Sequence, residues 1–158
     1  GVLNLDKGYV SRVEEFEWVD GAKDCVKAFN DRGWWVFVVT NQSGIARGYY
    51  TEDDMHALHA QMGEALAEDG ARIDAFYWCP HHPDAAEERY RHPDPPDRKP
   101  NPGMLLRAMA DWPVDRQASF MIGDKPGDME AAARAGVEGL LFEGGDLRAF
   151  LKARGRLP

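Results

Sequence analysis

The sequence predicts an α/β fold with a doubly wound parallel sheet, and three features support this prediction. Apolar runs of strand length alternate with segments of helical period along the chain. The first run, residues 34–39, contains six apolar residues without alternation, which is typical of a strand buried on both faces of a parallel sheet. Polar residues then follow two of the runs directly, and open α/β sheets bind ligands at the carboxyl ends of their strands.

Each element follows from its own local pattern. In chain order we expect helix 21–32, strand 34–39, helix 51–69, strand 73–78, helix 102–112, strand 118–122, helix 127–135, strand 138–142 and helix 146–154. Gly33 ends the first helix, and Thr51 with the acids after it opens the longest one. Asn101 is expected to cap the third helix, with Pro102 as its first residue. Gly136 closes the Ala-rich helix.

The chain is expected to form one domain over residues 1–158, without a large cap domain. On the longest helix, four apolar residues recur at helical spacing and are interpreted as core: Met55, Leu58, Met62 and Leu66. Cys25 lies on an apolar helical face and is interpreted as a core residue too.

Composition limits the classes of function. No apolar run approaches membrane-spanning length, and two cysteines give no disulfide framework, so a cytoplasmic location is expected. The formal net charge of −8 opposes binding to nucleic acid. We therefore expect a monomer with a small-molecule ligand and with neither a nucleic-acid nor a membrane partner.

Three segments predict a phosphate site. Thr40 and Asn41 come directly after the strand 34–39, at its carboxyl end, where a hydroxyl and backbone N–H groups can bind a phosphoryl group. Lys99 precedes a helix start, and Asp124 and Asp128 follow the strand 118–122. Two carboxylates at one strand end repel each other unless a hard cation such as Mg²⁺ lies between them. Taken singly, each segment has an ordinary interpretation, namely a polar turn, a solvated lysine and a pair of helix-capping acids.

The order of these segments resembles the haloacid dehalogenase (HAD) superfamily of phosphotransferases. Within it, the chain is similar to the group of heptose-1,7-bisphosphate 7-phosphatases and histidinol-phosphate phosphatases. The similar strings are TNQSGIARG at 40–48, CPHH at 79–82, RKPNPGM at 98–104 and GDK at 123–125. The resemblance runs over nearly the whole chain and implies a HAD-like Rossmannoid fold.

The resemblance also implies roles for individual residues. Thr40 and Lys99 would act on the phosphoryl group as catalytic residues. Asp124 would bind Mg²⁺, with Asp128 as a second ligand or as support for the first. Recognition of the sugar phosphate is assigned to Asp6, Lys7, Gly8, Tyr9, Asn41, Gln42, Ser43, Arg47, Arg98 and Lys125. A histidinol-phosphate or other small-phosphate phosphatase is the alternative within the same superfamily.

The chain departs from the family at its start. The family carries an Asp-x-Asp pair at the end of its first strand, and the first Asp is the nucleophile. Residues 1–4 match the family just after that pair, so we expect the first strand and the nucleophile to be missing from this chain. Residues 1–158 alone are then expected to show no phosphatase activity. A pseudoenzyme that binds phosphate without turnover is the other interpretation.

A second departure concerns zinc. The family often carries Cys-x-His followed by Cys-x-Cys, a four-ligand structural site. Cys79 and His81 match the first half, whereas Pro95 and Asp97 stand where the second half has thiolates. We expect no zinc and interpret Cys79 and His81 as vestigial ligands in a loop. On that interpretation, replacing Cys79 with Ser changes stability only slightly.

Overall fold

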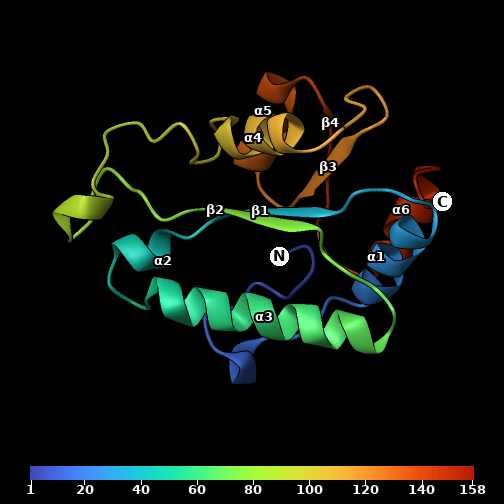
Figure 1. Ribbon diagram of the computed structural model, residues 1–158, viewed down its shortest axis with the longest axis horizontal. Helices are drawn as coiled ribbons and strands as arrows, with labels where there is room; N and C mark the ends of the chain where they lie inside the picture. The colour runs from blue at the N-terminus through green and yellow to red at the C-terminus, as the bar shows by residue number, and fades with distance from the viewer. The chain divides into compact units, whose positions relative to one another are not determined.

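The computed structural model describes residues 1–158, and helices and strands alternate along it (Figure 1). The elements are the 3₁₀ turn η1 (Val13–Glu15), α1 (Ala22–Asp31), β1 (Phe37–Asn41), α2 (Ser43–Ala46), α3 (Glu52–Glu68), β2 (Ala75–Cys79), η2 (Glu88–Tyr90), α4 (Gly103–Asp111), β3 (Phe120–Gly123), α5 (Pro126–Ala135), β4 (Glu138–Leu141) and α6 (Leu147–Ala153). Every helix and strand predicted from the sequence is present. The short elements η1, α2 and η2 were not predicted, because three or four residues are too few to display a period.

The strands pair in parallel, which confirms the α/β class, and they form two sheets of two strands each. β1 pairs with β2, and β3 pairs with β4. Phe120 lies opposite Glu138 and Gly123 opposite Leu141 in the second pair, so both of its strands run the same way. The predicted single sheet is thus divided, and a strand with one neighbour keeps more of its surface accessible than a central strand does.

β1 begins later than the apolar run that predicted it. Trp34 N donates to Phe29 O at 3.0 Å, and the two rings pack edge to face at 5.4 Å, so Trp34 belongs with the end of α1. All five residues of β1 are half-buried. The expectation of a strand buried on both faces is therefore wrong. Within the apolar run, Trp34 packs at the end of α1, and the residues from Phe37 onward belong to β1.

The contacts within the chain define two compact units, each described by itself. The first unit comprises 1–37, 52–75 and 142–158, and the second unit comprises 38–51 and 76–141. The prediction of a single domain stays a prediction. All predicted phosphate-binding residues from Thr40 to Asp128 fall in the second unit, whereas residues 6–9 fall in the first.

The first unit has a helical core. α1 packs against α6 (Figure 1), and Phe142 meets Phe150 edge to face at 5.1 Å. Leu66 is completely buried against Val26 and Ala71. The residues predicted as core on the longest helix are all buried, as is Cys25, which confirms that prediction: Met55, Leu58, Met62 and Leu66. None of the helices is both long enough and apolar enough to cross a membrane.

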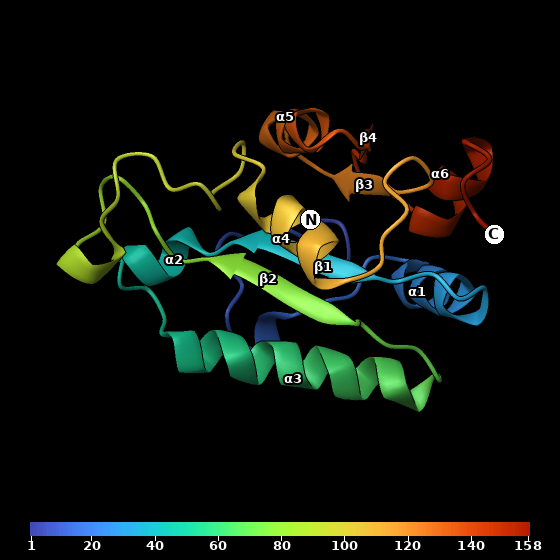
Figure 2. The same ribbon diagram turned by 45° about the horizontal axis from the view of Figure 1, so that its top comes forward.

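The second unit is organised around β3. α5 lies against β3 and β4, and α4 lies next to α5 (Figure 2). Their buried side chains form one cluster with Val39 of β1 packed against it, made up of Leu105, Met121, Ala131, Ala132 and Ala135. Alanines on α5 allow that helix to approach the sheet closely. The cluster thereby sets the carboxyl end of β1 near the carboxyl end of β3.

Candidate active site

Asn41, the last residue of β1, binds the backbone of Lys99 from a loop far along the chain. Its Nδ2 donates to Lys99 O at 3.1 Å, and its Oδ1 accepts from Lys99 N at 2.9 Å. Because a side-chain amide offers one donor group and one acceptor, this pair imitates one rung of a β-ladder. The side chain of Asn41, predicted to contact substrate, therefore fixes Lys99 beside the end of β1.

The ammonium group of Lys99 is fixed as well. Nζ lies 2.8 Å from Asp128 Oδ1 and donates to Val39 O at 3.1 Å. The Lys99 side chain is only 13% exposed and that of Asp128 only 9%. An ammonium has three N–H donors, and two of them are used here, so the third can reach a ligand. Lys99 is thus a positioned cation and not a solvated surface lysine.

Asp128 links this cation to the loop after β3. Its Oδ2 accepts hydrogen bonds from Asp124 N at 3.0 Å and from Lys125 N at 3.1 Å. Gly123 permits the approach, because a Cβ there would lie 2.2 Å from Asp128 Cβ. The capping role that acids often play at a helix start is therefore present. It accompanies an ion pair that reaches across to β1.

The environment of Asp128 determines its charge. Burial alone would raise the pKa of this carboxyl, since it disfavours the ionised form. The nearby charge and hydrogen bond of Lys99, together with the two backbone N–H groups, outweigh burial and lower the pKa below its ordinary value. Asp128 is therefore a carboxylate at neutral pH and a matched counter-ion for Lys99.

Asp124 is the better candidate for a magnesium ligand. It is half-buried directly after β3, and its backbone is fixed by Asp128. No group of three His, Cys, Asp or Glu side chains is arranged to bind a metal. Mg²⁺ fits nevertheless, because it typically takes one or two protein carboxylates together with phosphate oxygens and water. The oxygens of Asp128 already bind Lys99 and two N–H groups, so the structure favours the supporting role for Asp128 over the ligand role.

Thr40 contributes a hydroxyl at the carboxyl end of β1. Its Oγ1 donates to Asn41 O at 3.2 Å and accepts from Gln42 Nε2 at 3.2 Å. The other end of the Gln42 amide, Oε1, accepts from the hydroxyl of Tyr50. Gln42 N also donates to Cys79 O at 2.8 Å, which ties this turn to β2. Gln42, predicted to contact substrate, thus orients Thr40.

These groups together suit a phosphoryl ligand. A hydroxyl and an ammonium group stand at the end of β1, and a carboxylate able to bind a hard cation follows β3. Phosphate oxygens accept hydrogen bonds and carry negative charge, so they match donors and cations. The Thr40 hydroxyl and the Lys99 ammonium are each positioned by a neighbour and not left to solvent, which is the arrangement that electrostatic catalysis requires.

The other residues of the second unit that were predicted to contact the substrate differ in their exposure to solvent. Ser43 begins α2, whereas Arg47 follows it and is exposed, as is Lys125. Arg98 is half-buried, and its Nε is buried without a hydrogen-bond partner. An unpaired buried donor is costly, which supports a ligand-binding role for Arg98.

Residues 6–9 lie in the first unit, so their predicted contact with the substrate stays a prediction. Gly8 N donates to Asp6 Oδ1 at 3.0 Å, and Lys7 pairs with Glu17 at 2.7 Å. Tyr9 adopts a positive φ of 50°, which a side chain of its size rarely adopts. The segment is thus an exposed turn with its own internal contacts.

The residues around Cys79 do not fit a zinc ion. Cys79 Sγ lies 4.0 Å from His81 O, and Asp97 pairs with Arg107 at 3.2 Å. Pro95 and Asp97 stand where the family has thiolates, and two ligands from one segment cannot complete a tetrahedral shell. The interpretation of Cys79 as a loop residue is wrong, because it is the last residue of β2 and is 1% exposed.

We expect the purified protein to contain far less than one zinc per chain, and its melting temperature to be unaffected by a chelator. Because Cys79 is buried, Cys79→Ser should have more than the slight effect expected for a loop residue. It should destabilise the protein by about 1–2 kcal/mol, since it buries a hydroxyl where a thiol packed. Cys79→Ala is the matched control for lost volume without a new polar group. Elemental analysis and melting curves with and without chelator test this. Stoichiometric zinc that disappears in Cys79→Ser would contradict it.

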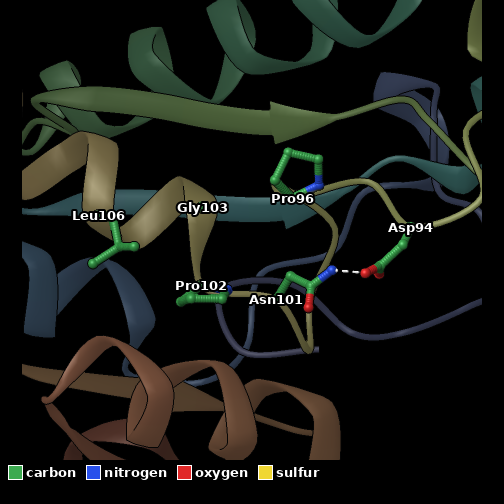
Figure 3. Close-up of a pocket in the computed structure, with 6 residues that line it drawn as sticks. All are labelled: Asp94, Pro96, Asn101, Pro102, Gly103 and Leu106. Atoms are coloured by element: carbon green, nitrogen blue, oxygen red, sulfur yellow. Dashed lines mark hydrogen bonds between the residues drawn. The ribbon is translucent and has the colours of Figure 1, made fainter.

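Asn101 does not cap α4, contrary to prediction. Pro102 occupies the cap position and α4 begins at Gly103. The Asn101 amide instead donates to Asp94 Oδ1 at 2.8 Å and to Pro95 O at 2.9 Å. Asn101 and Asp94 line a shallow hollow together with Pro96, Pro102, Gly103 and Leu106 (Figure 3). None of the predicted phosphate-binding residues lines it.

Three contributors to the site were missed by sequence reasoning. Tyr50 and the carbonyl of Val39 carry no motif, and Gly123 was given no role beyond its place in the string GDK at 123–125. A signal existed for Gly123 alone, since a glycine between a strand and a helix often marks a close approach. Tyr50 and Val39 act through contacts that only the fold creates.

Comparison with known proteins points the same way. Residues 97–153 match the HAD-hydrolase-like family. A D-glycero-β-D-manno-heptose-1,7-bisphosphate 7-phosphatase of Rhodopseudomonas palustris is 45% identical over 156 residues, covering 96% of this chain and 84% of the relative. An enzyme of the same name from Escherichia coli K12 is 44% identical over 137 residues, covering 87% of this chain and 71% of the relative.

Two solved structures share the fold. A heptose 1,7-bisphosphate phosphatase of B. bronchiseptica, complexed with magnesium and phosphate, gives a TM-score of 0.81 at 34% identity and covers 100% of this chain and 84% of that one. A putative HAD-like phosphatase from Mesorhizobium loti gives 0.85 at 39% identity, covering 91% of this chain and 69% of that one.

Proposed function

We propose that this chain, which belongs to the HAD-like phosphatases of the heptose-1,7-bisphosphate 7-phosphatase family, supplies the phosphate-binding residues of an enzyme that hydrolyses the 7-phosphate of D-glycero-D-manno-heptose 1,7-bisphosphate. The attacking carboxylate is assigned to the Asp-x-Asp pair that the family carries ahead of the residue matching Gly1. The observation that carries the proposal is the largely buried Lys99 ammonium, fixed at the end of β1 by Asp128 and Val39 O. The proposal includes a monomeric cytoplasmic protein, as the sequence predicts. A phosphatase of histidinol phosphate or another small phosphate is the alternative.

In the proposed mechanism, Lys99 and Thr40 bind the oxygens of the phosphoryl group that is removed. Negative charge spreads over these oxygens in the transition state, and preorganised donors stabilise it there. Asp128 keeps the ammonium in place through their 2.8 Å ion pair. Asp124 would hold Mg²⁺, which neutralises further charge on the phosphoryl oxygens. Arg98 is assigned to the substrate's other polar groups, because its buried Nε has no partner within the protein.

The experiment follows Mg²⁺-dependent phosphate release by ³¹P NMR, with heptose 1,7-bisphosphate and histidinol phosphate as competing substrates. It uses a form of the protein that carries an Asp-x-Asp pair ahead of Gly1, with residues 1–158 alone measured beside it. We expect loss of the 7-phosphate first and preference for the heptose bisphosphate. Residues 1–158 alone should release no phosphate. Preference for histidinol phosphate would favour the alternative, and no turnover of either substrate by the form that carries the Asp-x-Asp pair would contradict the proposal.

Asp124→Asn should reduce Mg²⁺-dependent turnover about a hundredfold or more, the scale seen when a group that stabilises developing charge is removed. The fold should persist, because the Asp124 contact with Asp128 uses the backbone N–H. Asp53→Asn makes the same change at an exposed residue of α3 and should leave the rate unchanged. An Asp124→Asn variant with an unaltered rate and an unaltered Mg²⁺ dependence would place the metal elsewhere.

A further inference from the structure

Tyr50 contacts the predicted phosphate-binding turn from outside every motif in the sequence. Its hydroxyl donates to Gln42 Oε1, and Gln42 Nε2 donates to Thr40 Oγ1 at 3.2 Å. Gly44 makes room for the tyrosine ring, because a Cβ there would lie 2.2 Å from Tyr50 Cε1. All four residues belong to the second unit. The three side chains form a short chain of hydrogen bonds that ends on Thr40.

The direction of these hydrogen bonds determines what Thr40 can do. A threonine hydroxyl has one hydrogen to donate and lone pairs that accept. Because Gln42 Nε2 donates to Thr40, the hydroxyl accepts from Gln42 and its own hydrogen points elsewhere, to Asn41 O at 3.2 Å. That distance is long for an O–H···O bond, so a phosphate oxygen can compete for the hydrogen.

With its amide reversed, Gln42 would have the opposite effect. Oε1 would then face Thr40 and accept its hydrogen, which leaves none for a ligand. Tyr50 decides between the two orientations, because a phenol is a more acidic donor than an alcohol and binds best to the amide oxygen. Gln42 N donates to Cys79 O at 2.8 Å, so the backbone of Gln42 is fixed and its side chain must be oriented by other contacts.

We propose that Tyr50 is a positioning residue that holds the Gln42 amide in the orientation that leaves the Thr40 hydroxyl free to donate to a phosphoryl oxygen. The inference rests on the proposed function, since it assumes that Thr40 binds phosphate. It assigns to Tyr50 a role in affinity for the phosphoryl group, distinct from the packing of its ring over α2.

The test measures binding of inorganic phosphate to residues 1–158 by ³¹P NMR titration at a fixed Mg²⁺ concentration. Tyr50→Phe keeps the ring and removes only the hydroxyl. We expect phosphate to bind about three- to tenfold more weakly, the equivalent of one hydrogen bond. The neighbouring exposed tyrosine supplies the matched control, and Tyr49→Phe should bind like the wild type. Melting curves verify that each variant is folded.

The same Tyr50→Phe change made in a Gln42→Met variant separates a positioning role of the Tyr50 hydroxyl from an effect on packing. Gln42→Met removes the amide, so Tyr50→Phe should have no further effect when added to it. Equal weakening by Tyr50→Phe in both backgrounds would overturn the inference, and so would unchanged binding in Tyr50→Phe beside weaker binding in Thr40→Val. If the wild type binds no phosphate, or Thr40→Val binds as tightly as the wild type, the proposed phosphate role of Thr40 fails and the inference with it.

Discussion

Lys99→Met is expected to weaken phosphate binding at least about tenfold and to destabilise the protein by about 3–5 kcal/mol. Affinity falls because the variant loses a charged donor at the end of β1. Stability falls because Asp128, with a side chain only 9% exposed, is left as a buried carboxylate without its cation. Methionine keeps the length of the side chain, so the effect reports charge and hydrogen bonding and not lost volume.

The measurements are phosphate titration by ³¹P NMR and urea unfolding of the same samples. Lys27→Met is the matched control, because Lys27 also pairs with an aspartate, Asp31, at 2.9 Å. That pair lies on the surface of α1 with side chains 44% and 58% exposed, and exposed pairs contribute little. A Lys99 variant no less stable than the Lys27 variant would show that the Lys99–Asp128 pair is not a buried one.

The stability loss should also depend on pH in a defined direction. In the wild type the pKa of Asp128 is lowered on folding, so the pair's contribution is present above the carboxyl's unfolded-state pKa and is lost as pH falls through its lower folded-state value. In Lys99→Met the cation is gone, so the pKa of Asp128 should be higher than in the wild type, because burial is then opposed only by the two backbone N–H groups. The difference between variant and wild type should therefore be largest near neutral pH and shrink as pH falls towards about 4. A constant difference over that range would contradict the prediction.

The sequence predicted the elements that bring the site together. Apolar runs and helix caps are local signals, and strand order in an α/β fold places strand ends together, so Thr40, Lys99, Asp124 and Asp128 could be proposed as neighbours. The contacts among these residues could not be predicted from the sequence. Asn41 meets Lys99 across 58 residues of chain, and no local pattern encodes which atoms of two distant segments meet.

The errors have the same physical cause. The run from Trp34 predicts a strand by composition, yet a contact between Trp34 and Phe29 keeps its first residues with α1. Asn101 is a suitable cap by residue type, but Asp94 and Pro95 compete for its amide. In each case a tertiary partner determined the role of a residue whose type permitted several.

Gly123→Ala is expected to destabilise the protein by about 3 kcal/mol, the upper end of the usual range for overpacking. A Cβ at this position would lie 2.2 Å from Asp128 Cβ and 2.7 Å from its Oδ2. Neither atom is at the flexible end of a long side chain. Asp128 can make room only by giving up its bonds to Lys99 and to the N–H groups of Asp124 and Lys125, or by moving the loop that carries them.

The same substitution four residues later provides the control, and its expected sign is opposite. A Cβ at Gly127 would lie 3.9 Å from Pro100 N, which is an ordinary contact. Gly127 is part of α5, where alanine is favoured over glycine by roughly 0.5–1 kcal/mol. Urea unfolding should thus separate Gly123→Ala from Gly127→Ala by about 3–4 kcal/mol, and phosphate binding should weaken only in the first. Equal stabilities would mean that Asp128 can move without destabilising the protein. The position of Asp128 would then not be what holds Lys99 in place.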